Sequence, residues 1–113
     1  MPHDSPGSPG SFDSMLLAHV MEHVDAEVAE SIVREYLPCV KPGGKLVFIT
    51  PQEVGHRSDS THVRFVDLDT LRLHAGNLGL AVERAYSFPL PRMAGKAFKY
   101  NEFVLLARRG PHA

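Results

Sequence analysis

Two apolar segments with one helix-length interval between them constrain the fold of this chain most. Residues 12–20 form a short, nearly continuous apolar run, and residues 45–50 form a second run that ends at Pro51. Such runs are typical of strands buried on both faces, as in a parallel sheet. Between them, Asp25 is a good N-cap for a helix, and Pro38 cannot continue one. The order strand, helix, strand predicts a right-handed βαβ unit with parallel strands.

The rest of the chain adds a second helix and two strands. Asp67 can cap this helix, and Gly79 suits the position just after its end. Strands are predicted at residues 80–86 and 102–108, and they should pair antiparallel because no helix separates them. A turn is predicted at residues 41–44, and long loops are predicted at residues 52–66 and 87–101. The predicted order β-α-β-α-β-β defines an α/β domain over residues 12–109, with a disordered lead at 1–11 and a tail at 110–113.

Composition and charge limit the classes of function that this chain can have. The formal net charge is −1 and no long run of Lys or Arg occurs, so no nucleic-acid partner is expected. No segment is apolar for long enough to span a membrane, and the lead has no apolar core of a signal peptide. The one cysteine, Cys39, lies in an apolar junction, so it predicts a buried structural thiol and a reducing, cytoplasmic location.

Two segments carry a resemblance to a known family. Residues 12–24 (FDSMLLAHVMEHV) and 36–51 (YLPCVKPGGKLVFITP) resemble the fourth strand, the following helix and the fifth strand of class I S-adenosylmethionine (SAM)-dependent methyltransferases. The resemblance covers residues 12 to 109. It implies a partial Rossmann-like methyltransferase sheet that holds the fourth to seventh strands, with the last strand inserted antiparallel beside the fifth.

The resemblance also implies where the cofactor would lie. In the family, residues just after the fourth strand meet the methionine end of SAM, and these are Ala18, His19 and Val20 here. The family's first strand, its Gly-x-Gly-x-Gly loop and its ribose-binding acid have no counterpart in the 11 residues before Phe12. Gly7 and Gly10 follow no strand and cannot replace the loop. We therefore expect weak or undetectable SAM binding by this chain alone.

Histidines are the candidate catalytic residues. Methyl transfer from a sulfonium depends largely on positioning, so a general base is optional. If one is used, a histidine suits the role because its side chain titrates near neutral pH. His19 is expected at a strand tip, and His56 and His62 in the next loop, so the three could line one pocket. Each could instead have a structural role, and His74 inside the second helix is expected to be a surface or packing residue. His3 and His112 fall in the predicted lead and tail.

The segment 19–23 (HVMEH) raises two metal hypotheses. It matches an inverted zinc-peptidase pattern, but that pattern needs both histidines on one helix, and His19 ends a strand. Some methyltransferases that resemble this chain carry a carboxylate and histidine metal site after the fourth strand, which Glu22, His23 and His62 could form. The usual first ligand there is Glu, whereas this chain has His19. We expect a structural role for Glu22 and His23, and predict no metal.

The function expected from the sequence is SAM-dependent methyl transfer to a small-molecule acceptor, by this chain or by a protein of which it is the C-terminal portion. The alternative is a non-catalytic half-domain. In that case the strand at residues 12–20 would be an open, apolar edge through which the chain dimerises or complements a partner. A third possibility is that the sequence is a piece of a longer protein.

Overall fold

The computed structural model describes residues 9–58 and 60–110. The disorder predicted for the lead and tail falls mostly on residues 1–8 and 111–113, which lie outside the described residues, as do His3 and His112. Among the described residues of the lead, the Gly10 amide donates a 2.9 Å hydrogen bond to the Pro38 carbonyl. No helix in the described part of the chain is long and apolar enough to cross a membrane.

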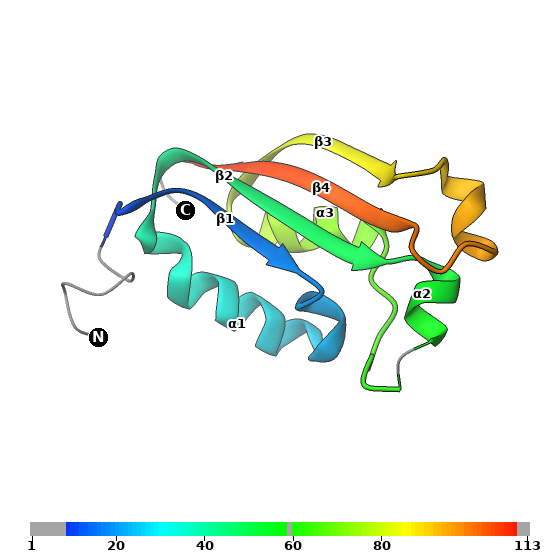
Figure 1. The fold of residues 1–113 in the computed structure, drawn as a ribbon. Helices are drawn as coiled ribbons and strands as arrows, with labels where there is room; N and C mark the ends of the chain where they lie inside the picture. Colours follow the sequence, from blue (N-terminus) through cyan, green and yellow to red (C-terminus); the bar gives the residue numbers. More distant parts are fainter. Residues whose placement is uncertain (1–8, 59, 111–113) are drawn as a thin grey trace.

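The elements follow the predicted order (Figure 1). The strands are β1 (Phe12–Ala18), β2 (Val40–Pro51), β3 (Leu80–Phe88) and β4 (Glu102–Arg109). The α-helices are α1 (Ala26–Tyr36), α2 (Glu53–Arg57) and α3 (Leu68–Asn77), and the 3-10 turns are η1 (Met21–His23), η2 (Leu37–Cys39) and η3 (Arg92–Lys96).

The four strands form one mixed sheet in the order β1-β2-β4-β3. β1 and β2 pair parallel, which confirms the βαβ unit, and β4 runs antiparallel to both β2 and β3. The last strand therefore enters between the fifth-strand equivalent and the strand before it in sequence, as expected. This arrangement places the start of β4 beside the end of β2, where Glu102 pairs with Pro51.

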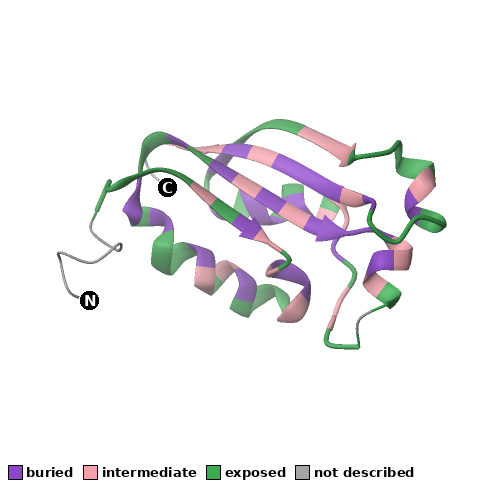
Figure 2. Ribbon diagram, viewed as in Figure 1, coloured by how far each residue is buried: buried purple, intermediate pink, exposed green. Residues whose placement is uncertain are grey.

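Both long helices, α1 and α3, cover the same face of the sheet (Figure 1). The core lies between this face and the helices, so burial alternates along residues 44–50 of β2 (Figure 2). In β4, the successive residues 103–105 are all buried. The two helices are also joined by polar contacts, because Glu30 Oε2 lies 2.7 Å from His74 Nδ1 and accepts a 2.9 Å bond from Asn77. His74 is only 3% exposed, so of the two predicted roles it has that of a packing residue and not that of a surface residue. The largest core side chains include Phe48, Leu46, Phe103, Leu105, Leu71 and Val33.

β1 is an edge strand, and a groove runs beside it. Leu16 on this strand is 63% exposed, although it is a large aliphatic residue. A mainly apolar groove of about 390 Å³ lies between β1 and α1, with Val20, Ile32 and Tyr36 among its lining residues. The open, apolar edge expected from the sequence is therefore present on the described chain.

Several boundaries differ from the sequence prediction. Residues 41–44, expected as a turn, bulge out of β2, because Phe12 pairs with Val40 and Ser14 already pairs with Lys45. Gly43 permits this with a φ of 78°. The expected loop at 52–66 contains α2, and the loop at 87–101 contains η3. The first strand ends at Ala18 because His19 adopts a left-handed backbone with a φ of 59°.

Candidate functional site

Polar side chains gather in one pocket where β1 and β2 end. The pocket has a volume of about 380 Å³. Its lining comes from the residues after β1, from the segment after β2 and from the start of β4. The lining residues are His19, His23, Pro51, Gly55, Ser58, His62, Lys99, Tyr100 and Glu102. Ligands of open α/β sheets bind at this end of the strands, so the pocket is the candidate site.

His19 is held at the mouth of this pocket by backbone and side-chain contacts. Its amide donates a 2.9 Å hydrogen bond to the Ile49 carbonyl, which continues the β1-β2 ladder by one step. The left-handed backbone then turns the chain away from the sheet. A non-glycine residue in this conformation is strained, and such residues cluster at functional sites. The imidazole Nε2 lies 2.5 Å from Glu102 Oε2, so β4 orients the ring.

Glu22 lies at the centre of the polar cluster and is fully buried. It follows His19 by three residues in η1, and its side chain has no exposed surface. Neither of its carboxylate oxygens has a hydrogen-bond partner among the described residues. Leaving a carboxylate buried without partners is costly, so this group requires an explanation.

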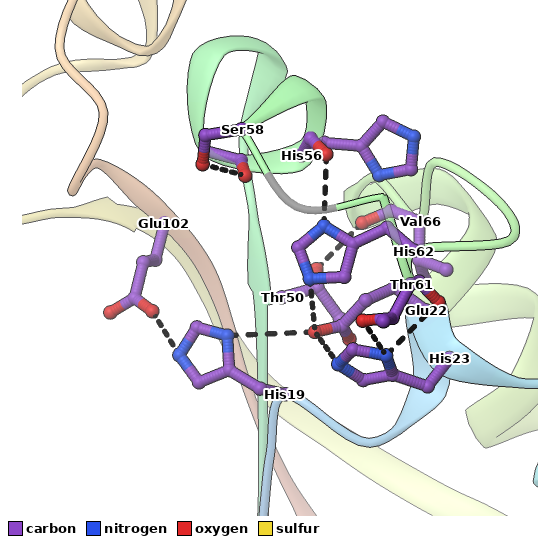
Figure 3. Close-up of polar contacts among 11 residues, drawn as sticks. His19, Glu22, His23, Thr50, His56, Ser58, Thr61, His62, Val66 and Glu102 are labelled. Atoms are coloured by element: carbon purple, nitrogen blue, oxygen red, sulfur yellow. Dashed lines mark hydrogen bonds and ion pairs between the residues drawn. The ribbon is translucent and has the colours of Figure 1, made fainter.

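Three imidazoles surround the Glu22 carboxylate (Figure 3). Glu22 Oε2 lies 3.5 Å from His19 Nδ1, 3.8 Å from His23 Nε2 and 3.7 Å from His62 Nε2. These separations are too long for hydrogen bonds. Glu22, His23 and His62 each offer one ligand atom, and the three atoms lie within 4.8 Å of one another, so they are the group that could hold a metal ion.

The segment after α2 brings His62 to the cluster because it is tied to η1 and β2. The Val63 amide donates a 2.8 Å bond to the Glu22 carbonyl. The Thr50 hydroxyl, at the end of β2, donates a 2.6 Å bond to the Val66 carbonyl. Arg64 adds a 2.9 Å bond to the Val24 carbonyl. The position of His62 therefore follows from the contacts of the residues that come directly after it.

In His62 and His23, the ring nitrogen Nδ1, which is not the one nearest Glu22, contacts other protein atoms. His62 Nδ1 lies 2.9 Å from the His56 carbonyl, which can only accept, so Nδ1 carries the proton and donates. His23 Nδ1 lies 3.2 Å from the Thr61 carbonyl and from the Thr61 hydroxyl. In a neutral imidazole with the proton on Nδ1, the nitrogen facing Glu22 is an acceptor. For His62, that acceptor nitrogen faces the acceptor carboxylate.

His56 lies behind His62 and is not among the pocket-lining residues. The two rings stack with centroids 5.3 Å apart, and His56 packs edge-on against Phe65 (Figure 3). Burial lowers the pKa of His56, and the charges of His62 and Arg57 act in the same direction, against that of Glu22. Of the three predicted catalytic histidines, the structure brings His19 and His62 to the pocket, whereas His56 supports His62.

The predicted cofactor-binding residues follow the end of β1. Ala18 is its last residue, and His19 lines the polar pocket. Val20 instead lines the apolar groove beside β1. These three residues thus lie between the two cavities.

The zinc-peptidase pattern lacks the helix that it needs. His23 belongs to the three-residue turn η1, and His19 precedes that turn with a left-handed backbone. The two histidines therefore do not share a helical face.

Sequence reasoning missed Tyr100 and Glu102, which both line the pocket. A usable signal existed for Glu102. An antiparallel strand begins at the edge where its parallel neighbours end, so the first residue of the predicted last strand belongs at the site. Tyr100 follows no pattern, because it lies in the irregular segment between η3 and β4.

Comparison with known proteins identifies the fold. No family model and no curated protein matches the sequence. Among solved structures, a SAM-dependent methyltransferase from Archaeoglobus fulgidus superposes with a TM-score of 0.69 over 89% of this chain, at 16% identity. The chain has the fold of part of a SAM-dependent methyltransferase. It spans 61% of the length of that protein.

Two further methyltransferases extend this finding. The 1,6-didemethyltoxoflavin N1-methyltransferase of Burkholderia thailandensis, solved with 1,6-didemethyltoxoflavin and S-adenosylhomocysteine, matches with a TM-score of 0.69 at 12% identity. The match covers 91% of this chain and 46% of that protein. A methyltransferase-like protein from Bacillus halodurans gives a TM-score of 0.68 at 14% identity, with 94% of this chain and 68% of that one covered. The partial Rossmann-like sheet predicted from the sequence is confirmed.

Proposed function

We propose that this chain is the substrate-side portion of a SAM-dependent methyltransferase that acts on a small-molecule acceptor. The observation that carries the proposal is the polar pocket at the ends of β1 and β2, in a sheet of methyltransferase fold. That edge is where ligands of such sheets bind. The Burkholderia neighbour, solved with a small-molecule substrate and S-adenosylhomocysteine, supports a small acceptor.

In this proposal Ala18, His19 and Val20 meet the methionine end of SAM. His19 is positioned by Glu102 through Nε2, and His62 is positioned through Nδ1. Either imidazole can then interact with the nucleophile of an acceptor in the pocket. Positioning supplies much of the rate of an in-line methyl transfer, so a general base is an addition to it. Methyl transfer occurs when the cofactor-binding strands are also present.

The chain alone should bind the cofactor poorly. Its 113 residues contain no Gly-x-Gly-x-Gly sequence, so no such loop brings backbone amides to the cofactor. Calorimetric titration with S-adenosylhomocysteine should show no micromolar binding. At millimolar ligand, amide shifts in nuclear magnetic resonance should be confined to residues 18–20 and the pocket lining. Micromolar affinity would contradict the predicted weakness, and shifts remote from the pocket would contradict the proposed site.

A non-catalytic half-domain is the second candidate, and the groove beside β1 favours it. An edge strand with an exposed Leu16 and an apolar groove of about 390 Å³ can accept a further strand. Under this hypothesis the chain dimerises or complements a partner through residues 12–20. Light scattering across a concentration series tests it, because a monomer that persists at high concentration counts against it.

We further propose a reducing, cytoplasmic location and a methyltransferase-like unit over residues 12–109. Support for the location comes from Cys39, which is only 5% exposed and is the chain's one cysteine. Structural thiols of this kind persist in reducing compartments.

A further inference from the structure

We propose that Glu22, His23 and His62 bind a divalent transition-metal ion of the zinc type, with an open coordination position facing the pocket. The sequence favoured a structural role for Glu22 and His23 and no metal. The structure favours a metal because the buried Glu22 carboxylate has no hydrogen-bond partner among the described residues. The inference does not depend on methyl transfer, since it concerns binding to the chain itself. With an ion bound, His62 Nε2 is a ligand, and His19 is the imidazole that remains to act on an acceptor.

The first argument comes from the charge at the centre of the cluster. The Glu22 side chain is fully buried, and both of its oxygens lack a hydrogen-bond donor among the described residues. A neighbouring cation is the usual compensation for such a group. The described residues place imidazoles around it, but no Lys or Arg within ion-pair distance.

The second argument comes from the proton positions. His62 donates through Nδ1 to the His56 carbonyl, and His23 Nδ1 faces the Thr61 carbonyl. Their Nε2 atoms lie 3.7 and 3.8 Å from the Glu22 carboxylate. In a neutral His62 with its proton on Nδ1, Nε2 is an acceptor that faces another acceptor, and a cation between the two atoms attracts both. Metal-binding histidines have this arrangement, with the outer nitrogen bonded to a carbonyl or carboxylate.

The third argument comes from spacing and donor type. Zinc bonds of about 2.0–2.2 Å place neighbouring ligand atoms about 3.3 Å apart in a tetrahedral site. The observed separations from Glu22 Oε2 exceed this by only a few tenths of an ångström. Two imidazoles and one carboxylate suit zinc and related transition ions, whereas Mg²⁺ prefers oxygen ligands.

The surroundings leave the fourth side of the cluster open to the pocket. His62 is 7% exposed at its side chain and His23 is 34% exposed, so the group lies at the pocket wall. His19 Nδ1 also faces Glu22 Oε2 at 3.5 Å, with Glu102 holding its other nitrogen (Figure 3). His19 is therefore a positioning residue beside the ion, and three protein ligands remain as in open zinc sites.

Direct metal binding tests the proposal. The untagged chain is stripped with a chelator and titrated calorimetrically with Zn²⁺, and Co²⁺ is used as a probe because its visible absorption reports tetrahedral coordination. We expect one ion per chain, with Zn²⁺ bound at least about 100-fold more tightly than Mg²⁺. At Zn²⁺ about 100 times its Kd, the Tm should rise by on the order of 10 °C. Absence of binding, or equal affinity for Mg²⁺, would overturn the proposal.

Variants assign the ligands. Glu22→Gln and His62→Ala should each weaken Zn²⁺ binding by more than about 100-fold and abolish the Co²⁺ spectrum, since each removes a direct ligand. The matched control is Glu27→Gln, which removes an exposed carboxylate on α1 outside the cluster. This control should bind Zn²⁺ as the wild type does.

The stability of Glu22→Gln without metal distinguishes the loss of a ligand from unfolding of the variant. In chelator, Glu22→Gln should be at least as stable as the wild type, because the variant removes a buried, uncompensated charge. Loss of binding in that variant then cannot reflect unfolding. Unchanged Zn²⁺ affinity in Glu22→Gln would refute Glu22 as a ligand and the proposal with it.

Discussion

At the residue scale, the two helix caps read from the sequence are confirmed and predict a measurable stability. Asp25 Oδ1 accepts a 3.0 Å bond from the Val28 amide, and Asp67 Oδ1 accepts a 2.9 Å bond from the Thr70 amide. Asp25→Ala and Asp67→Ala should each lower the free energy of unfolding by about 1 kcal/mol in urea denaturation. Asp69→Ala, an exposed acid in the same first turn, is the control and should change it by less than about 0.5 kcal/mol. Equal losses at Asp67 and Asp69 would contradict the capping assignment.

Glu30 provides a pH-dependent contribution at the same scale. Burial raises the pKa of Glu30, but hydrogen bonds from Asn77 and His74 and the charges of His74 and Arg34 outweigh it, so the folded pKa is lowered. A lowered glutamate pKa adds stability that is complete above the unfolded-state pKa and is lost as the pH falls through the folded pKa. Glu30→Gln should therefore be less stable than the wild type at pH 7 in urea denaturation. The difference should shrink at acid pH, and a constant difference would contradict this linkage.

The site was partly predictable at the residue level. His19 and His62 were expected in one pocket, and both line it, because strand ends of a parallel sheet meet at one edge. The cluster around Glu22 was not expected. The cluster forms because residues 61–66 fold back over η1. Hydrogen bonds from Val63 and Thr50 hold this segment, and no periodic pattern in the sequence predicts their partners.

At the scale of elements, two glycines near the end of α3 have different structural roles. Gly79, just past Leu78, has a φ of 72° and ends the helix as its sequence position predicted. Gly76 lies inside α3, and a Cβ there would meet nothing within 4 Å. Gly79→Ala should lower the free energy of unfolding by about 1 kcal/mol, and Gly76→Ala should raise it by about 0.5–1 kcal/mol. Thermal and urea unfolding of both variants would show the opposite signs, and the same sign in both would refute the assignment.

Element identities were predicted better than element boundaries. Apolar runs and caps fixed the strands and the two long helices, because burial and capping act locally. The short helix α2 was missed because its five residues carry too few turns for a periodic pattern. The end of β1 at Ala18 was missed because Val20 extends the apolar run, whereas the left-handed His19 interrupts the strand.

At the scale of the whole molecule, the sheet has both long helices on one face and an open edge at β1 (Figure 1). The parallel pairing of β1 with β2 was predictable, because a short helix can only return the chain right-handed to the same sheet. What lies beyond β1 cannot follow from these residues, since a strand edge accepts any chain that matches its backbone spacing.

Exposed leucines on different elements distinguish an association edge from ordinary apolar surface. Leu16 on β1 is 63% exposed, and Leu73 on α3 is 64% exposed. If the edge recruits a second chain, Leu16→Lys should shift a concentration series in light scattering towards monomer, because lysine on an edge strand opposes strand addition. Leu73→Lys should leave the series unchanged, and neither should alter stability in urea much, since both side chains are already in solvent. An equal response to both substitutions would mean that general surface hydrophobicity, and not the edge, drives association.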